Sequence, residues 1–254
     1  MSNKISKLGL QKFNIIMGLF HFVQGVLLIV LSNNYTLPIS ASFLRFNELT
    51  LKLEPTTKVL FNLSLPMLIA VFFFLSAGFH FVIATVYNKE YNKDLTSGIN
   101  KFRWIEYSIS ASIMMVSIAL LVGVYDIMSL LMIFALTSVM NLMGLVMEIH
   151  NQTTKKTNWL SFWIGSAAGL IPWVVIAFYF WLSADNGKPA PDFVYWIFVS
   201  IFIFFNAFAV NMVLQYKKVG PWKDYLYGER AYIILSLVAK SLLAWQVFAG
   251  TLRP

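Results

Sequence analysis

A single lysine, Lys240, lies near the middle of the last long apolar segment, residues 229–252. A lysine at the centre of a membrane-spanning helix costs about 2.5 to 3.5 kcal/mol on insertion scales. With about ten residues on each side and a rise of about 1.5 Å per residue, either surface is roughly 15 Å away, too far for the side chain to reach. The amine must therefore pair with a buried acid or react covalently, for example with an aldehyde to form a Schiff base. We interpret Lys240 as a functional residue, because ionisable groups inside membranes usually are.

Glu106 is the only acidic residue clearly inside another apolar segment, and we expect it to be the partner of Lys240. Both residues are expected in the half of the membrane nearer the cytoplasm. The alternative partner for Glu106 is Arg103, one helical turn earlier. Ser236 precedes Lys240 by four residues and so shares its helix face, where the hydroxyl can bond the amine or, alternatively, a helix carbonyl.

Two histidines, His21 and His80, also lie inside apolar segments. Gln24 follows His21 by three residues, and Ser76 precedes His80 by four. A lone buried histidine is usually a satisfied core residue, but two in lipid indicate a water-filled cavity or a proton-holding site. No metal-ligand spacing accompanies them, so no metal site is predicted.

The composition is that of an integral membrane protein. The 254 residues are 59% hydrophobic and 12% charged, with a mean hydropathy of +0.71. We expect one domain, with no cleaved signal peptide, because the basic start runs directly into a full-length span. The chain has no cysteine and no nucleophile, metal or phosphate-loop constellation, so we predict that it is not an enzyme. The net charge of +8 reflects loop asymmetry rather than nucleic-acid binding.

Hydropathy predicts an all-α bundle of seven transmembrane helices at about 10–31, 61–87, 100–124, 127–149, 159–183, 192–216 and 229–252. Of the 19 Lys and Arg residues, 13 flank one set of helix ends and five flank the other; the remaining one is Lys240. This split predicts a multi-pass cell-membrane protein with a cytoplasmic N-terminus and an extracellular C-terminus. In the long external loop, residues 35–44 and 48–54 alternate between apolar and polar, which predicts a short β-hairpin that packs over the bundle or contacts a second copy. A disordered loop is the alternative.

Polar residues also gather at the cytoplasmic helix ends: Asn100, Arg103, Glu148, Tyr225, Glu229 and Arg230. An ordinary interfacial ring of charges is the alternative interpretation of this group. Aromatic and small residues are concentrated in segments 159–183 and 192–216. They are helix-packing residues by periodicity, and become pocket walls if a flat apolar ligand lies mid-bundle.

Taken together, these features resemble the heliorhodopsins, retinal-binding proteins of inverted orientation. The matching segments are GLFH at 18–21, LSAGFHF at 75–81, FRWIEYS at 102–108, IPW at 171–173, FFN at 204–206 and GERAYIILSLVAKS at 228–241. The resemblance runs over essentially the whole chain.

The resemblance implies a role for each matching residue. Lys240 would form the Schiff base with all-trans retinal, Glu106 would be its counterion, and Ser236 would take part in its hydrogen bonding. A polar cavity would hold His21, His80, Ser76, Gln24 and Tyr107, and the cytoplasmic polar cluster would be Asn100, Arg103, Glu148, Tyr225 and Glu229. The expected retinal walls are Trp104, Met140, Gly144, Trp163, Gly169, Phe205 and Trp245. The external hairpin would lie at the surface of a homodimer.

The predicted function is light sensing through a conformational change read by an unknown cytoplasmic partner. Pumping usually needs carboxylates on both sides of the Schiff base, but Asp126, Asp185 and Asp192 fall in loops. The alternative is a light-driven or light-gated proton or ion transporter that uses the histidine cavity. A third possibility is a retinal-free membrane scaffold or transporter in which Lys240 and Glu106 form a structural ion pair.

Overall fold

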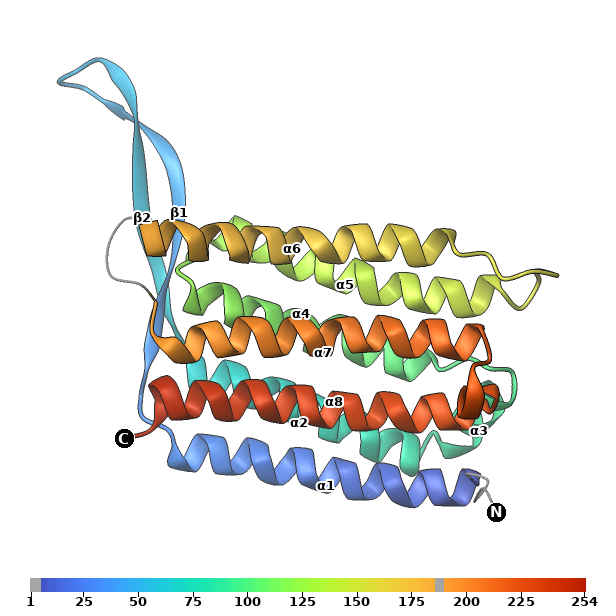
Figure 1. The fold of residues 1–254 in the computed structure, drawn as a ribbon. Helices are drawn as coiled ribbons and strands as arrows, with labels where there is room; N and C mark the ends of the chain where they lie inside the picture. The colour runs from blue at the N-terminus through green and yellow to red at the C-terminus, as the bar shows by residue number, and fades with distance from the viewer. Residues whose placement is uncertain (1–5, 186–189) are drawn as a thin grey trace.

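The computed structural model describes residues 6–185 and 190–254. Among these residues, seven helices are long and apolar enough to cross a membrane, and they run side by side (Figure 1). They are α1 (Lys7–Leu31), α2 (Leu65–Ala84), α4 (Lys101–Leu121), α5 (Ile127–His150), α6 (Leu160–Asp185), α7 (Asp192–Tyr216) and α8 (Tyr225–Val247). A 3₁₀ turn (Gly220–Lys223) precedes α8, and a π-helical turn (Phe248–Leu252) extends it. The predicted seven-helix bundle is confirmed.

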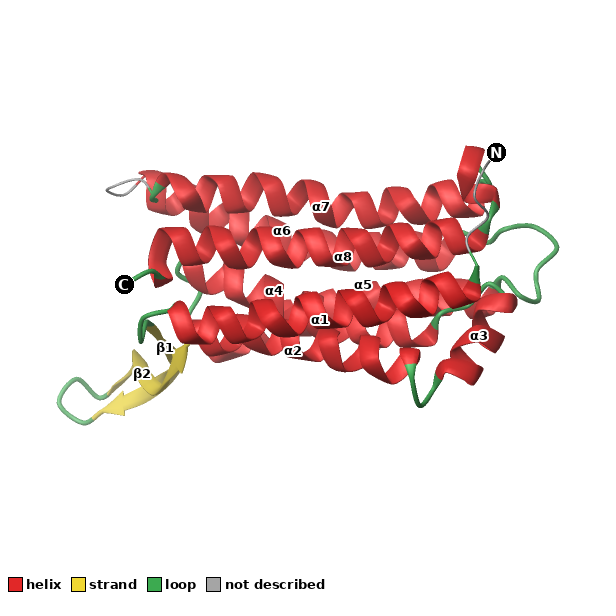
Figure 2. Cartoon of the chain, turned by 90° about the horizontal axis from the view of Figure 1, so that it is seen from below, coloured by secondary structure: helices red, strands yellow, loops and turns green. Residues whose placement is uncertain are grey.

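A short helix that hydropathy did not predict, α3 (Asn88–Thr96), follows α2. Its sequence is polar, so an apolar window passes over it, and only Tyr91 and Leu95 are buried. Figure 2 shows α3 at one end of the bundle and the β-hairpin at the other. These two ends are called the α3 end and the hairpin end below.

The hairpin consists of β1 (Thr36–Asn47) and β2 (Lys52–Ser64), paired antiparallel with a bulge at Ile39/Ser40. A hairpin between the first two spans was predicted, but it is longer than expected. The expected strand at 48–54 is wrong in part, because residues 48–51 form the turn, where Leu51 takes a φ of 53°. Residues 61–64 were assigned to the second span but continue β2, because their apolar side chains alternate along a strand, and α2 begins after the Ser64 N-cap.

Only the base of the hairpin packs against the bundle. Leu37 and Ile39 are buried, and the Ser40 N–H donates to the Tyr125 carbonyl (2.9 Å). The tip projects beyond the helices (Figure 1), and Leu49 there is 95% exposed. The expectation that the hairpin covers the bundle therefore holds only for its base.

The two halves of the bundle are filled differently. The main apolar core, which includes Leu28, Phe72, Ile118, Ile201 and Leu243, occupies the hairpin half. Among the described residues, the buried carboxylates are Glu106, Glu148 and Glu229, and all lie in the α3 half. Among the described residues, the buried carboxylates are thereby confined to one side of the bundle centre.

Side-chain caps fix where the two key helices begin. Asn100 Oδ1 accepts from the Arg103 N–H (3.0 Å) at the start of α4, and Asp224 Oδ1 accepts from the Leu226 N–H (3.0 Å) at the start of α8. Caps of this kind satisfy backbone donors that have no partner inside the helix. They set the positions of Glu106 on α4 and of Lys240 on α8.

Candidate functional site

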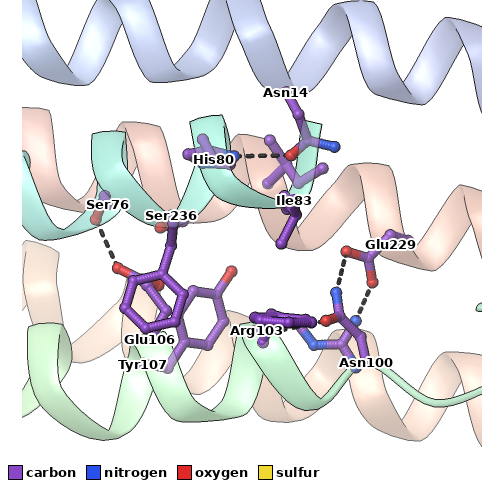
Figure 3. A pocket seen from close by; sticks show the side chains of 13 residues that line it. Asn14, Ser76, His80, Ile83, Asn100, Arg103, Glu106, Tyr107, Glu229 and Ser236 are labelled. Atoms are coloured by element: carbon purple, nitrogen blue, oxygen red, sulfur yellow. Dashed lines mark hydrogen bonds and ion pairs between the residues drawn. The ribbon is translucent and has the colours of Figure 1, made fainter. Parts of the chain in front are cut away.

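Lys240 and Glu106 lie together at the centre of the bundle. Lys240 Nζ is 3.2 Å from Glu106 Oε1, and both side chains are less than a tenth exposed. Lys240 Nζ also donates to Ser236 Oγ (2.7 Å). From α2, the Ser76 hydroxyl donates to the same Glu106 oxygen (2.6 Å; Figure 3). Three helices therefore supply one buried ion pair and its two hydroxyl partners.

Tyr107 forms one wall beside this pair. Lys240 Nζ lies 5.3 Å from the centre of the Tyr107 ring, within range of a cation–π contact. The Tyr107 hydroxyl donates to the Tyr232 carbonyl (2.9 Å), which ties α4 to α8. This hydrogen bond therefore holds the ring in place, and it keeps the hydroxyl from bonding to the Lys240 amine.

The histidines lie on the α1 and α2 side of the pair. His80 Nδ1 is 2.7 Å from Asn14 Oδ1, and the His21 and His80 rings stack at 5.5 Å between centroids. Neither His21 nitrogen has a hydrogen-bond partner among the described residues. Gln24 lies apart from them and accepts a hydrogen bond from Trp245 Nε1 (3.0 Å). Sequence reasoning missed Asn14, although it precedes His21 by two helical turns and so shares its helix face.

A polar cavity of about 360 Å³ extends from this region toward the α3 end. Glu106, Ser236 and Tyr107 line one part of it, and Arg103 and Glu229 line another (Figure 3). Of the two histidines, His80 lines this cavity, whereas His21 stacks on His80 and is not part of the lining. A cavity with this lining can hold water between the two charged groups.

The Arg103 cluster, made of Arg103, Glu148, Glu229, Asn100 and Tyr225, lies at the α3 end of this cavity. The Arg103 guanidinium pairs with both Glu148 and Glu229 rather than with Glu106. Glu148 also accepts from Tyr225 Oη (3.1 Å) and from the Asn100 backbone N–H (2.9 Å). Asn100 Nδ2 donates to Glu229 Oε1 (2.6 Å).

Two further donors to the cluster were not predicted, and one expected member lies outside it. Trp104 Nε1 donates to Glu148 (2.7 Å), and Tyr91 Oη donates to Glu229 (3.2 Å). Burial, followed by the negative charge of Glu229, raises the pKa of Tyr91 well above its usual value, so the hydroxyl remains a donor. Arg230 is exposed and lies over the Phe13 ring at 5.2 Å.

An apolar cavity opens beside Lys240 on the side of α5, α6 and α7. One part, of about 380 Å³, is lined by Lys240, Met114, Met140, Phe205 and Phe208. A second part, of about 500 Å³, shares Met140, Phe205 and Phe208 and extends to Trp104 and Phe162. Ligand sites are mostly apolar, with a few precisely placed polar groups. The residues present therefore fit a long, flat, apolar group attached at Lys240.

Glycines shape this cavity, because side chains in their place would collide with its walls. A Cβ at Gly144 would clash with the Trp104 ring, and one at Gly169 would clash with Met140. Two residues expected as walls lie elsewhere. Trp163 is 65% exposed on the outer face of α6, next to Phe162, which does line the cavity. Trp245 packs against Phe248 and lines neither part.

The heliorhodopsin family model matches residues 10–252, a stretch that includes part or all of each of the seven membrane helices. No curated protein matches the chain. The matched family consists of retinal-binding, light-responsive membrane proteins and is not a known class of enzyme. An apolar cavity next to a buried lysine agrees with that chemistry. The chain therefore belongs to the heliorhodopsin family.

Proposed function

We propose that this heliorhodopsin is a light sensor in which Lys240 carries all-trans retinal as a Schiff base and Glu106 is the counterion. The observation that carries the proposal is the 3.2 Å approach of Lys240 Nζ to Glu106 Oε1 at the mouth of the apolar cavity. A buried cation needs an opposite charge in contact, and Glu106 provides a single one. When bound, retinal supplies a chromophore that absorbs visible light and isomerises.

The chain's own residues hold the proton at the Lys240 nitrogen. Glu106 balances its charge, while the Ser236 and Ser76 hydroxyls hold the nitrogen and the carboxylate in their positions. A proton that leaves Nζ meets Glu106 first, and beyond it lies the polar cavity that His80 and Asn14 line. A change at the nitrogen therefore alters the electrostatics of the α3 half.

The distribution of acids favours signalling over pumping. Outward transport needs proton-holding groups on both sides of the nitrogen, and within the described residues the hairpin half has an apolar core without a buried carboxylate. The alternative is a light-driven or light-gated proton or ion transporter. His21 next to His80 favours that alternative, because within the described residues neither His21 nitrogen has a hydrogen-bond partner, which leaves its unprotonated nitrogen open to a transferred proton.

The excess of Lys and Arg at the α3 end supports a cytoplasmic position for that end, with the N-terminus inside and the C-terminus outside. The signal would then be read by a cytoplasmic partner. A homodimer that forms through the hairpin completes the proposed arrangement, since apolar side chains such as Leu44, Phe46 and Leu53 are exposed there.

The test is the visible absorption spectrum of the protein expressed with all-trans retinal. We expect a visible band in the wild type, no band in Lys240→Ala, and an unchanged band in the control Lys155→Ala, which alters a lysine in the α5–α6 loop. A folded wild-type protein without a band would refute the proposal and leave Lys240 and Glu106 as a structural pair. A light-induced current in a voltage-clamped cell would show that the protein transports ions, and would refute the signalling function.

A further inference from the structure

Two cavities unconnected with retinal meet at Trp222, in the 3₁₀ turn between α7 and α8. One, of about 660 Å³, opens at the α3 end and is lined by polar and aromatic residues that include Gln215, Tyr216, Lys218 and Lys223. The other is an open groove along the outside of α7 and α8. Trp222 lines both, so a molecule that contacts this indole can have a part in each.

The first cavity suits an anion. Lys218 and Lys223 line it, and among the described residues no carboxylate does. Neither lysine forms an ion pair within residues 6–185 and 190–254. Thr157 and Tyr216 add hydroxyl groups to the same wall. Within the described residues, this cavity therefore holds two lysines that have no ion-pair partner.

Lys218 occupies a position where glycine is usual. The Lys218 N–H bonds to the Gln215 carbonyl (3.2 Å) and the Val219 N–H to the Leu214 carbonyl (3.1 Å), the two bonds of a Schellman motif that ends α7. The motif requires left-handed backbone, and Lys218 adopts it with a φ of 52°. Glycine takes this conformation without the steric cost that lysine meets. Helix termination alone therefore does not account for a lysine here.

The groove suits a hydrocarbon chain. It is lined mainly by apolar side chains, among them Ile203, Val210, Leu214, Ile234 and Leu235. Its lining on α7 runs from residue 202 to residue 214, which at about 1.5 Å per residue is roughly 18 Å. One leaflet of the hydrocarbon core is about 15 Å thick, half of the roughly 30 Å of a bilayer. The groove therefore matches one acyl chain of the leaflet at the α3 end.

Trp222 is held rigidly at the junction of the two cavities. Its Nε1 donates to Asn211 Oδ1 (2.6 Å), and Asn211 Nδ2 donates to the Gly228 carbonyl (3.1 Å), which ties the turn to both α7 and α8. Tryptophan is enriched at the level of lipid headgroups. Basic pockets between membrane helices on the cytoplasmic side are a known form of anionic-lipid site.

We propose that this region binds one anionic phospholipid, with its headgroup at Lys218 and Lys223 and one acyl chain in the groove between α7 and α8. The proposed lipid site does not involve retinal, so its test does not depend on the proposed photochemistry. It lies close to the Arg103 cluster, because Tyr225 lines the first cavity and its hydroxyl donates to Glu148.

The experiment measures quenching of tryptophan fluorescence by brominated acyl chains, with the full-length protein in nanodiscs. Dibrominated phosphatidylglycerol is compared with dibrominated phosphatidylcholine at matched mole fractions, and the signal of Trp222 is obtained by subtracting that of Trp222→Phe. We expect Trp222 to prefer phosphatidylglycerol by roughly five- to thirtyfold, the scale for two lysines that face an anionic headgroup. The control Lys155→Gln/Lys156→Gln removes two lysines of the neighbouring loop and should keep the preference.

Lys218→Gly separates binding from folding. Glycine relieves the left-handed strain, so the variant should unfold at the same temperature as the wild type or higher, yet lose roughly fivefold of the lipid preference. Lys223→Gln should lose a similar amount. Equal quenching by both lipids, or a preference that survives both substitutions, would overturn the proposal. Stabilisation by inorganic phosphate in pure phosphatidylcholine, without any lipid preference, would assign the lysines to a soluble anion instead.

Discussion

Two buried charged groups face the same polar cavity, and they differ in charge balance. The Lys240 and Glu106 pair sets one cation against one carboxylate. In the Arg103 cluster, one guanidinium serves two carboxylates, Glu148 and Glu229. If Glu106, Glu148 and Glu229 are all ionised, the Lys240–Glu106 pair is neutral and the Arg103 cluster carries one net negative charge.

The two groups also differ in how fully their carboxylates are satisfied. Glu106 has Lys240 and Ser76 as partners. Glu148 accepts from the guanidinium, a backbone N–H, an indole and a phenol. A carboxylate with few partners responds strongly to a change in one of them, whereas a fully bonded one resists it. We infer that the pair is suited to respond to a change at Lys240, and the cluster to anchor α3, α4, α5 and α8.

The largest effect is expected from Arg103→Met. It leaves two carboxylates buried without a cation, and breaking a buried pair in this way typically costs about 3–5 kcal/mol. The variant should fail to accumulate as folded protein or should lose most of its thermal stability, as measured by circular dichroism during heating. Adding Glu148→Gln and Glu229→Gln removes the stranded charges and should recover much of the loss. If the triple variant unfolds as readily as Arg103→Met, charge is not what the arginine supplies.

Glu106→Gln should rank next. It leaves Lys240 buried without a counterion, for a loss of about 3 kcal/mol, smaller than for Arg103→Met because one charge is stranded instead of two. In the retinal-loaded protein the visible band should also shift to the red, because the charge that stabilises the ground state is gone. The exposed Glu90→Gln is the matched control and should leave both the melting temperature and the band unchanged. An unshifted band in Glu106→Gln would remove this residue from the counterion role.

Glu229→Gln should cost less than Glu106→Gln, about 1–2 kcal/mol. It removes the excess negative charge of the cluster, and its amide oxygen still accepts from Asn100 and Tyr91. The measurement is the melting temperature of the two variants side by side. Equal losses of melting temperature would show that the Arg103 cluster does not carry excess negative charge. The two groups would then not differ in charge balance.

Tyr91→Phe tests the cluster from α3 and should have the smallest effect, about 1 kcal/mol for one hydrogen bond. The pKa of Tyr91 is raised in the folded protein, so its contribution is present below the ordinary tyrosine value of about 10 and is lost as the pH rises through the folded value. The wild type should therefore lose thermal stability above pH about 10 more steeply than Tyr91→Phe. Tyr227→Phe, on the outer surface, is the control. Parallel pH profiles for the wild type and Tyr91→Phe would place the hydroxyl outside the cluster.

The sequence could predict the helices and the pairing of charges because lipid leaves few alternatives. A span must be long and apolar, so all seven predicted segments agree with the structure to within four residues at each end. A buried lysine needs an acid, and Glu106 was the one clear candidate inside a span. Ser236 was predicted to lie beside Lys240 because residues four positions apart share one face of a helix. The matched family was equally visible in the residues themselves.

What the sequence could not decide was which faces of the helices meet. Periodicity places Arg103 and Glu106 on α4 but does not say that Arg103 turns to Glu148 and Glu229 on two other helices. Tyr91 was invisible because α3 is polar and short, and its contact with Glu229 joins residues 138 positions apart. Trp163 and Phe162 are adjacent in sequence, yet one faces outward and the other lines the cavity, because the rotation of α6 is set by packing against its neighbours. The sequence by itself determined the spans and their scarce charges, whereas the tertiary structure decided the depth, rotation and neighbours of each side chain, because these depend on the packing of all the helices at once.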